Sequence, residues 1–555
     1  MVWLAGRVVN LLLALGFSAF NRAFQGGTRV YVSLVGLLLR ASPVVLLAYG
    51  GMLYGTWLLF ADTPAGFIPA QDKGYLVLNV RLADSASLER TQAVMSRVED
   101  LASRVLGVRH TVAIAGQSLL LNTNAPNFGA MYVMLESFEE RLQTKRTADQ
   151  IAEELRDLFA REVSEADVNI LGAPPIEGLG TSGGFRVVIQ DRGENGLSVL
   201  EGVSQAVVDQ GNSNGLLRDV FSGFRAATTW LELDIDRDSI RKMGLSIGDV
   251  FNALQVNFGS LYVNDFNRFG RTWQVNVQAD ARYRMRTDDL RRMYVRSPTA
   301  GSVPLASFVR VRSVPGPLMI YRHNLYPAAF VNADAASGVS SWEAITSLKS
   351  LAEQQLAPSM RVEYTELAFL QQLAGNTAMY AFLLAVVLVF LVLAAQYESW
   401  SLPLAVILVV PMCLLCAVVG VRMAGLDINI FTQIGFVVLV GLACKNAILI
   451  VEYARSRTLA GSPAYDATLE ACRLRLRPIV MTSLAFVFGV IPLVLGEGAG
   501  AEMRRTLGTA VFSGMLGVTV FGVFLTPVFF YVIQRVVGRN HRSRLETQPD
   551  HAAAP

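Results

Sequence analysis

Apolar residues concentrate in two parts of the chain, before residue 60 and after residue 377, and the stretch between them has the mixed polarity of a soluble protein. A helix needs about 20 apolar residues to cross the hydrocarbon core of a bilayer. Stretches of about that length occur at 41–60, 376–396, 402–424, 430–454, 478–496 and 507–534. The pattern predicts one membrane-spanning helix, then a large extramembrane domain, then a five-helix bundle within 371–537.

The first 40 residues precede these spans. Residues 2–20 are apolar, but Arg7 and Asn10 interrupt the run, and no cleavage motif of the A-x-A type follows it. The run therefore differs from a secretory signal peptide. We expect segment 1–40 to be interfacial or cytoplasmic, ahead of the first span.

Arginines between and beside the spans set the orientation. They form three groups, at Arg22, Arg29 and Arg40, at Arg455, Arg457, Arg473, Arg475 and Arg477, and at Arg535, Arg539, Arg542 and Arg544. Six spans place all three groups on one side, which the positive-inside rule makes cytoplasmic. Both termini, including the tail 538–555, are then cytoplasmic, and domain 61–370 faces the periplasm of a bacterium.

The outer domain begins with elements in the order strand, helix, strand, strand, helix, strand. The strands are expected near 74–81, 108–115, 129–135 and 166–171, with helices after the first strand and near 147–162. This order is that of the split βαβ, or ferredoxin-like, unit. The chain is therefore predicted to be a polytopic α-helical membrane protein with a large α+β periplasmic domain.

A second unit of the same kind is expected to be interrupted by an insert. It begins with a strand at Phe185 and continues with a helix at 197–210 and a strand at 217–222, and elements near 328–332, 342–355 and 361–364 complete it. Short strands and a helix at 247–256 occupy the insert. The domain thus divides into 61–173, 174–227, 228–326 and 327–370, a binding or assembly module without a catalytic cluster.

Composition agrees with a membrane protein and excludes other classes. Of 555 residues, 52% are hydrophobic and only 17% are charged, where soluble domains carry about a quarter. The net charge of +3 is too small to indicate nucleic-acid binding. The four cysteines, Cys413, Cys416, Cys444 and Cys472, lie in or beside the apolar region, so we expect them to pack there and not to bind metal.

Lys445 stands out because it lies inside the span 430–454. A lysine there costs about 3 kcal/mol unless it is paired or hydrated, although it could also extend to the cytoplasmic interface. Ile434, Val438, Gly441 and Glu452 lie within about 40° of its direction on a helix. Gly441 would let another helix approach closely. Glu452 is two turns away from Lys445 and near the interface, and the spans contain no other Asp or Glu within the membrane. The anion that pairs with Lys445 is therefore expected to come from another polypeptide.

Thr482 lies four residues after Pro478, which we expect to open the fifth span. A membrane threonine commonly bonds to the carbonyl one turn earlier. The alternative is a hydroxyl in a proton relay with Lys445. For Arg475 and Arg477, we favour a role in setting the orientation of the spans over a role in such a relay.

One enzymatic motif occurs formally. Residues 180–184 fit G-x-S-x-G, the nucleophile elbow, which needs a strand before it and a helix after it. Here a loop rich in proline and glycine precedes the motif and an extended run follows it. A hydrolase is therefore disfavoured, and no nucleotide-binding motif is present.

Several runs together resemble the AcrB-type pumps of the resistance-nodulation-division (RND) family, in its hydrophobe and amphiphile branch. They lie in order between about residues 17 and 538, at 67–69, 178–181, 263–266, 283–285, 395–401, 441–453 and 475–483. The heavy-metal branch should show clustered periplasmic methionines as soft ligands, and those of this chain are scattered.

The resemblance implies a trimeric multidrug antiporter of the Gram-negative inner membrane. It would export small hydrophobic or amphiphilic compounds by proton antiport, with protons as coupling ion and no cofactor, together with a periplasmic adaptor and an outer-membrane channel. It implies that Lys445, Thr482 and Arg475 belong to a proton relay with two aspartates of another helix. Residues 61–173, and 174–227 with 327–370, would be porter subdomains, and 228–326 a docking insert.

The chain also departs from the family pattern. It matches only the C-terminal half, so it would need an Asp-bearing N-terminal half in the same or a separate chain; the alternative is a truncated half that acts as an inert remnant or scaffold. Leucines and polar residues replace the family's switch loop at 116–122. The candidate substrate-pocket residues are Val112, Gln117, Leu119, Phe128 and Tyr132.

Overall fold

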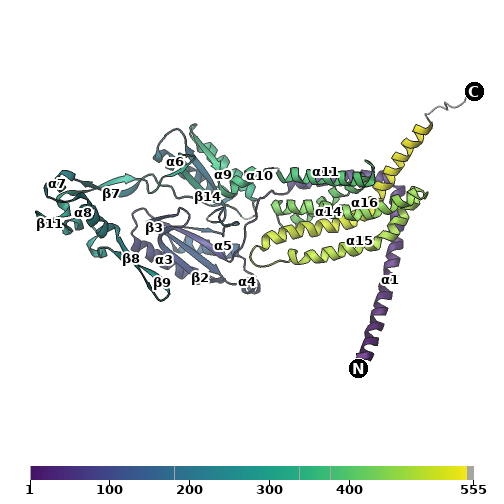
Figure 1. Cartoon of the computed structure of the whole chain (residues 1–555), viewed down its shortest axis with the longest axis horizontal. Coiled ribbons are helices and arrows are strands. Elements are labelled where there is room, and N and C mark those ends of the chain that lie inside the picture. The colour runs from purple at the N-terminus through teal and green to yellow at the C-terminus, as the bar shows by residue number, and fades with distance from the viewer. Residues whose placement is uncertain (1, 181, 337, 376, 547–555) are drawn as a thin grey trace, which may run out of the picture. The chain divides into compact units, whose positions relative to one another are not determined.

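The computed structural model describes residues 2–180, 182–336, 338–375 and 377–546, and of residues 2–20 and 537–546 only the backbone. The chain divides into two compact units (Figure 1). The first holds the membrane helices and two sheets, and the second consists of Asn195–Glu201 and Phe224–Arg322. Each unit is described by itself.

Within the described residues, six helical segments are long and apolar enough to cross a membrane, as the sequence pattern predicts. They are α2 (Ser42–Asp62), α10 (Glu366–Ala374) with α11 (Thr377–Tyr397), α12 (Leu402–Ile407) with α13 (Val410–Met423), α14 (Ile430–Leu459), α15 (Ala464–Val494) and α16 (Ala501–Glu546). A further helix, α1 (Val2–Arg40), precedes them and packs on the bundle through Tyr31, Val35 and Leu39. The Tyr31 hydroxyl donates to the carbonyl of Val523 at 2.9 Å.

Two details of the spans differ from the sequence expectation. The third span is two helices, α12 and α13, which break at Leu408 and Val409 just before Pro411. Proline cannot donate the backbone hydrogen bond that would continue the helix. The fifth span was expected to open at Pro478, which was wrong: α15 begins at Ala464, and Pro478 and Pro492 both lie inside it. The amphipathic run 464–477 extends the helix in front of the apolar run.

α16 lies at the centre of the bundle and packs against α13, α14 and α15. Ala510 is fully buried, and Gly514 approaches α14 so closely that a methyl group on it would lie 2.3 Å from Leu439 Cδ1. A methyl group on Gly517 would lie 2.4 Å from Cys416 Cβ. These three small residues let α16 pack closely against α13 and α14.

The first sheet has the strand order β2-β3-β1-β4 and is antiparallel. Its strands are β1 (Tyr75–Leu82), β2 (Val108–Ser118), β3 (Thr123–Leu135) and β4 (Ala166–Leu171). α3 (Leu88–Ala102) and α5 (Ala148–Glu162) bury one face of it over alternate residues such as Leu78, Val80 and Met131. A short helix, α4 (Phe138–Thr144), precedes α5. The opposite face carries the other residues of each strand.

The second sheet is built from two distant parts of the chain, as expected. It has the order β13-β14-β5-β15, and β6 also pairs with β14. The strands are β5 (Phe185–Asp191), β6 (Leu217–Ser222), β13 (Tyr321–His323), β14 (Tyr326–Ala335) and β15 (Met360–Tyr364), with α6 (Leu197–Asn212) and α9 (Ser341–Gln355) as helices.

The second unit has a small core of its own around Ile240, Val250 and Leu305. It contains β7 (Thr228–Ile235) paired with β12 (Val309–Gly316), the pair β10 (Tyr294–Ser297) and β11 (Gly301–Pro304), and the hairpin of β8 (Leu261–Arg268) and β9 (Arg271–Val277). Its helices are α7 (Arg237–Lys242) and α8 (Ile247–Leu254). Every residue of the hairpin strands is exposed.

Backbone contacts place the turn before α14 on the side of the membrane where the first sheet lies. The segment after α2 forms a bridge between Ala65 and Ile428, and the Ile428 N–H donates to the carbonyl of Pro64 at 2.9 Å. The turn 425–429 therefore lies on the same side of the bundle as the segment that leads from α2 into the first sheet.

Candidate functional site: an intramembrane lysine and an extramembrane cleft

Lys445 lies on an uncovered face of the bundle. Along this face of α14, Ile434 is 47% exposed and Val438 is 44% exposed, and Gly441 and Lys445 are also exposed. No atom lies within 4 Å of where a methyl group on Gly441 would be. Among the residues that the structure describes, Lys445 has no ion pair. The helix that Gly441 was expected to admit is therefore not among the described residues of this chain.

Thr482 makes a local hydrogen bond. Its hydroxyl donates to the carbonyl of Ile479 at 3.1 Å, and the side chain is half-buried. This contact corresponds to the local alternative for a membrane threonine. A hydroxyl can donate one hydrogen bond and accept others, so Thr482 still offers acceptor lone pairs.

The residues that follow Lys445 and Thr482 join the two helices. Asn446 donates from Nδ2 to Ser483 Oγ at 3.1 Å, and their side chains are 2% and 1% exposed. Asn446 Oδ1 is buried and has no partner in the described part of the chain. This bond places Lys445 and Thr482 at one level of the bundle. Sequence reasoning missed it, although an asparagine within an apolar run was the available signal.

Arg475 lies further along the same pair of helices. Its guanidinium lies 5.1 Å from the ring centroid of Tyr453, two turns beyond Lys445. At 1.5 Å per residue, this contact lies about 12 Å along α14 from Lys445. Arg475 Nε is buried without a partner within the described ranges. Nearby, Arg457 pairs with Glu470 at 2.8 Å. The structure therefore brings Lys445 and Thr482 to one level and places Arg475 at another.

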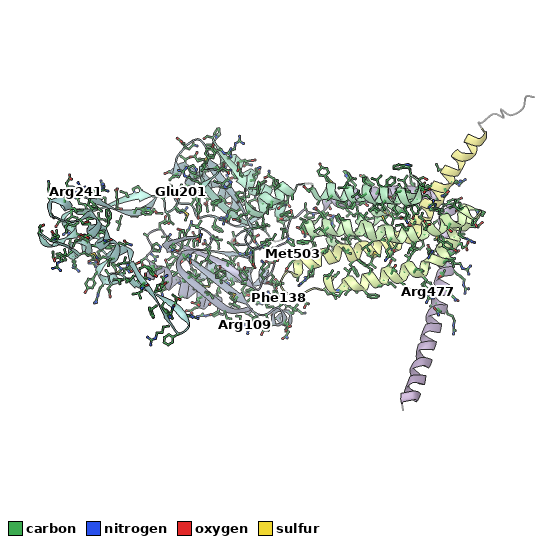
Figure 2. The ribbon with its side chains drawn as sticks, viewed as in Figure 1. Arg109, Phe138, Glu201, Arg241, Arg477 and Met503 are labelled. Carbon is green, nitrogen blue, oxygen red and sulfur yellow. The ribbon has the colours of Figure 1, made fainter. Side chains whose placement is uncertain are left out.

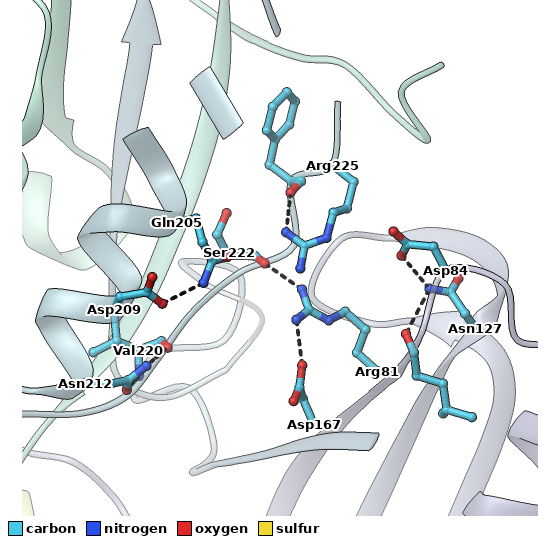
Figure 3. A network of polar contacts seen from close by, with 12 residues as sticks. Arg81, Asp84, Asn127, Asp167, Gln205, Asp209, Asn212, Val220, Ser222 and Arg225 are labelled. Carbon is cyan, nitrogen blue, oxygen red and sulfur yellow. Dashed lines mark hydrogen bonds and ion pairs between the residues drawn. The ribbon is translucent and has the colours of Figure 1, made fainter. Parts of the chain in front are cut away.

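A cleft of about 330 Å³ lies on the helix-free face of the first sheet. Arg81 projects from β1 of the first sheet toward Ser222 of β6, in the second sheet (Figure 3). Its Nη2 pairs with Asp167 at 2.6 Å, and its Nη1 donates to the carbonyl of Ser222 at 3.2 Å. The cleft is thus bordered by one sheet, by α6 and by β6, and it combines charged groups with the apolar side chains of Leu120, Leu121 and Phe128.

The candidate pocket residues lie at different distances from this cleft. Phe128 lines it and is 2% exposed. Val112 and Tyr132 face each other across β2 and β3 but do not line it, and the Tyr132 ring packs near Tyr75. Gln117 pairs with Asn124 and Leu119 is half-buried. From the hairpin turn, Leu120 and Leu121 line the cleft instead, and sequence reasoning missed both.

A second ion pair joins the two subdomains. Arg156 Nε lies 2.8 Å from Asp219 Oδ2, and Arg156 Nη2 donates to the carbonyl of Ile170 at 3.0 Å. Asp219 is largely buried, and this burial raises the pKa of its carboxyl against the opposing effect of Arg156. The contact holds α5 and β4 of one sheet domain to β6 of the other.

Asp219 should make stability depend on pH. Because its folded-state pKa is raised, the folded protein keeps this proton to higher pH than the unfolded chain, whose aspartates titrate near about 3.9. The free energy of unfolding then falls as pH rises through that window. The melting temperature of the wild type relative to Asp219→Asn should therefore decrease as the pH rises above about 3.9. A constant or increasing difference in thermal melts would contradict this assignment.

The remaining sequence motifs have local structural explanations. Ser182 lies in a loop between β4 and β5, and its hydroxyl donates to the carbonyl of Gly183 at 3.2 Å. Thr181 lies outside the described residues. A nucleophile elbow lies between a strand and a helix, whereas the loop that contains Ser182 is followed by the strand β5. In the membrane, the Cys413 thiol donates to the carbonyl of Val410 at 2.8 Å.

Within the described residues, six apolar helices and two sheets inserted between the first two of them are the architecture of a polytopic membrane protein with a large extramembrane part. The model of the AcrB/AcrD/AcrF family matches residues 11–534, and the chain belongs to this family of RND efflux pumps.

Curated relatives agree with this assignment. The chain is 34% identical over 529 residues to the toluene efflux pump membrane transporter TtgB of Pseudomonas putida, covering 94% of this chain and 49% of that protein. It is 33% identical over 527 residues to the multidrug export protein AcrF of Escherichia coli, covering 94% and 50%. The chain thus spans about half the length of the relatives it matches.

Proposed function

We propose that this chain supplies one half of a proton-driven efflux transporter for hydrophobic and amphiphilic compounds. The observation that carries the proposal is Lys445, a cation in the middle of an uncovered membrane face without an anion in the described part of the chain. An intramembrane charge is costly and marks an ion or proton pathway in membrane proteins. Relatives named as multidrug and solvent efflux pumps support the same interpretation.

The relay would form where an Asp-bearing half covers this face. Two carboxylates opposite Lys445 would give the ammonium its anion, and protonation of one carboxylate would release it. When one partner of a buried ion pair loses its charge, the other charge is left uncompensated. Proton uptake by a carboxylate would therefore change the packing between the two halves. The Asn446–Ser483 hydrogen bond would keep Lys445 and Thr482 in register. Arg475, about 12 Å away, would act toward the cytoplasmic end.

The cleft beside Arg81 would be part of the substrate path. Its floor combines Phe128 and two leucines with hydrogen-bonding groups, which suits amphiphilic molecules. The strand order β2-β3-β1-β4 supports ferredoxin-like porter subdomains on either side of it. The exposed hairpin of β8 and β9 would belong to a docking insert for assembly.

The wider arrangement follows from the same proposal. The protein would lie in the inner membrane of a Gram-negative bacterium, with cytoplasmic termini and a periplasmic domain. It would function as a homotrimer with a periplasmic adaptor and an outer-membrane channel. Protons would be the coupling ions, without a cofactor and without an enzymatic reaction.

Transport in efflux-deficient cells tests the proposal. Cells that carry this chain together with the Asp-bearing half, adaptor and channel should accumulate less of a fluorescent amphiphile than cells without the chain. A protonophore should abolish the difference, because the proton gradient drives export. Equal accumulation with and without the chain, at matched expression, would refute transport. Export that continues in de-energised cells would refute proton coupling.

A further inference from the structure

A second cavity, of about 530 Å³, lies where the first sheet domain meets the start of α16. Its walls come from the segment before β1, from α4 and from the loop and helix 496–505. Phe138 of α4 and Met503 of α16 mark this region in Figure 2. The cavity is separate from the cleft beside Arg81 and from Lys445.

Three buried polar atoms of residues lining this cavity have no hydrogen-bond partner in the described part of the protein. They are Gln71 Nε2, Arg141 Nη2 and Glu502 Oε2. Arg141 is only 3% exposed, and its other nitrogens are satisfied, Nη1 by Asp72 at 2.7 Å and Nε by the carbonyl of Glu136 at 3.1 Å. A buried donor left unpaired costs about 1–3 kcal/mol, and more when it is charged. The two donors and the acceptor therefore indicate a polar ligand.

The arrangement of charge indicates a ligand that carries both signs. Three arginines of the cavity each have a carboxylate partner, Arg141 with Asp72 at 2.7 Å, and Arg156 with Asp219 and Arg218 with Asp334 at 2.8 Å each. Beyond these pairs, Arg141 Nη2 and Gln71 Nε2 have N–H groups without a partner in the described residues, and a guanidinium is well suited to phosphate oxygens. Glu502 offers an unpaired carboxylate oxygen to a cation.

The position of the cavity indicates a lipid. Ala501 and Glu502 line it and also begin the last membrane-spanning helix, so the cavity lies at the depth of the lipid head groups. Leu76, Phe138 and Leu142 add apolar lining beside the polar atoms. We propose that this cavity binds the phosphoethanolamine head group of a membrane phospholipid. Its phosphate would accept from Arg141 Nη2 and Gln71 Nε2, and its ammonium would donate to Glu502 Oε2. This inference does not depend on transport.

Lipid binding to the delipidated full-length chain in detergent tests the inference. Native mass spectrometry would compare short-chain phosphatidylethanolamine, phosphatidylcholine and phosphatidylglycerol, with inorganic phosphate as a fourth ligand. We expect phosphatidylethanolamine to bind at least about tenfold more tightly than the other two lipids, a difference of about 1.4 kcal/mol. The choline group cannot donate a hydrogen bond to Glu502, and the glycerol head group has no cation.

Variants locate the site. Glu502→Gln should remove the preference for phosphatidylethanolamine over phosphatidylglycerol, and Gln71→Leu should weaken both lipids. Glu139→Gln, an exposed change on α4 that does not line the cavity, should bind as the wild type does. Equal binding of the three lipids, or unchanged preference in Glu502→Gln, would overturn the proposal and leave solvent as the partner of these atoms. Inorganic phosphate that binds as tightly as the lipid would overturn the lipid assignment.

Discussion

Replacing Lys445 by methionine should reduce transport by the assembled pump by about 100-fold or more, the usual cost of removing a group that transfers protons. Methionine keeps the length and apolar volume of the side chain but cannot carry a proton. The measurement is the initial efflux rate of a fluorescent amphiphile at matched protein levels. Transport at the wild-type rate would remove Lys445 from the proposed relay.

Two further variants separate a relay from other effects at Lys445. Arg473→Gln removes an exposed cation from the first third of α15 and should transport normally. Lys445→Arg keeps the charge but cannot release a proton, so it should stay inactive if the amine itself must change its protonation state. If arginine restores transport, the residue is a fixed counter-ion and not a proton carrier. Thermal melting of this chain purified alone should be the same for both Lys445 variants and the wild type, because Lys445 makes no ion pair among the described residues.

The sequence was sufficient to locate the membrane helices and most strands. Long apolar runs leave few alternatives in a bilayer, since every backbone group must be paired within a helix. The split second sheet was also predictable, because short strand-forming runs occur at 185–190, 328–332 and 361–364, with a helical run between the last two. Helix boundaries at proline were less predictable. Proline is also common in the first turn of a helix, so the sequence allowed a helix that begins at Pro478. The packing of residues 464–477 instead stabilises a longer helix that begins at Ala464.

The site was predictable in part for a related reason. Lys445 could be recognised from its cost in the membrane, but the Asn446–Ser483 bond depends on how α14 and α15 are rotated against each other. In the hairpin turn, the pairing of β2 and β3 shifts between Ala115 and Gln117, and Asn122 has φ of 48°. These irregularities rotate successive side chains out of strand alternation, so Leu120 and Leu121 line the cleft where Gln117 and Leu119 were expected.

The same dependence on helix contact makes Gly508 the position where a small change should do most damage to the bundle. A methyl group on Gly508 would lie 2.8 Å from Leu493 Cβ and 2.9 Å from the backbone atoms Leu493 C and Val494 N. Backbone atoms cannot move away as a flexible side chain can, so α15 and α16 would have to separate. Overpacking of this kind costs about 1–3 kcal/mol, and Gly508→Val should reach the upper end.

Gly489 provides the control, because it lies in α15, the helix that Gly508 of α16 contacts, but has no atom within 4 Å of its added methyl group. Gly489→Ala should leave the melting temperature unchanged or raise it slightly, since alanine favours a helix by about 1 kcal/mol over glycine. The stability of both variants is measured as the melting temperature of the detergent-purified chain, with size-exclusion chromatography to detect aggregation after heating. A Gly508→Val protein as stable as Gly489→Ala would mean that α15 and α16 do not approach each other at this point. Loss of stability in Gly508→Val alone would show that backbone contact between these helices limits which side chains the bundle accepts.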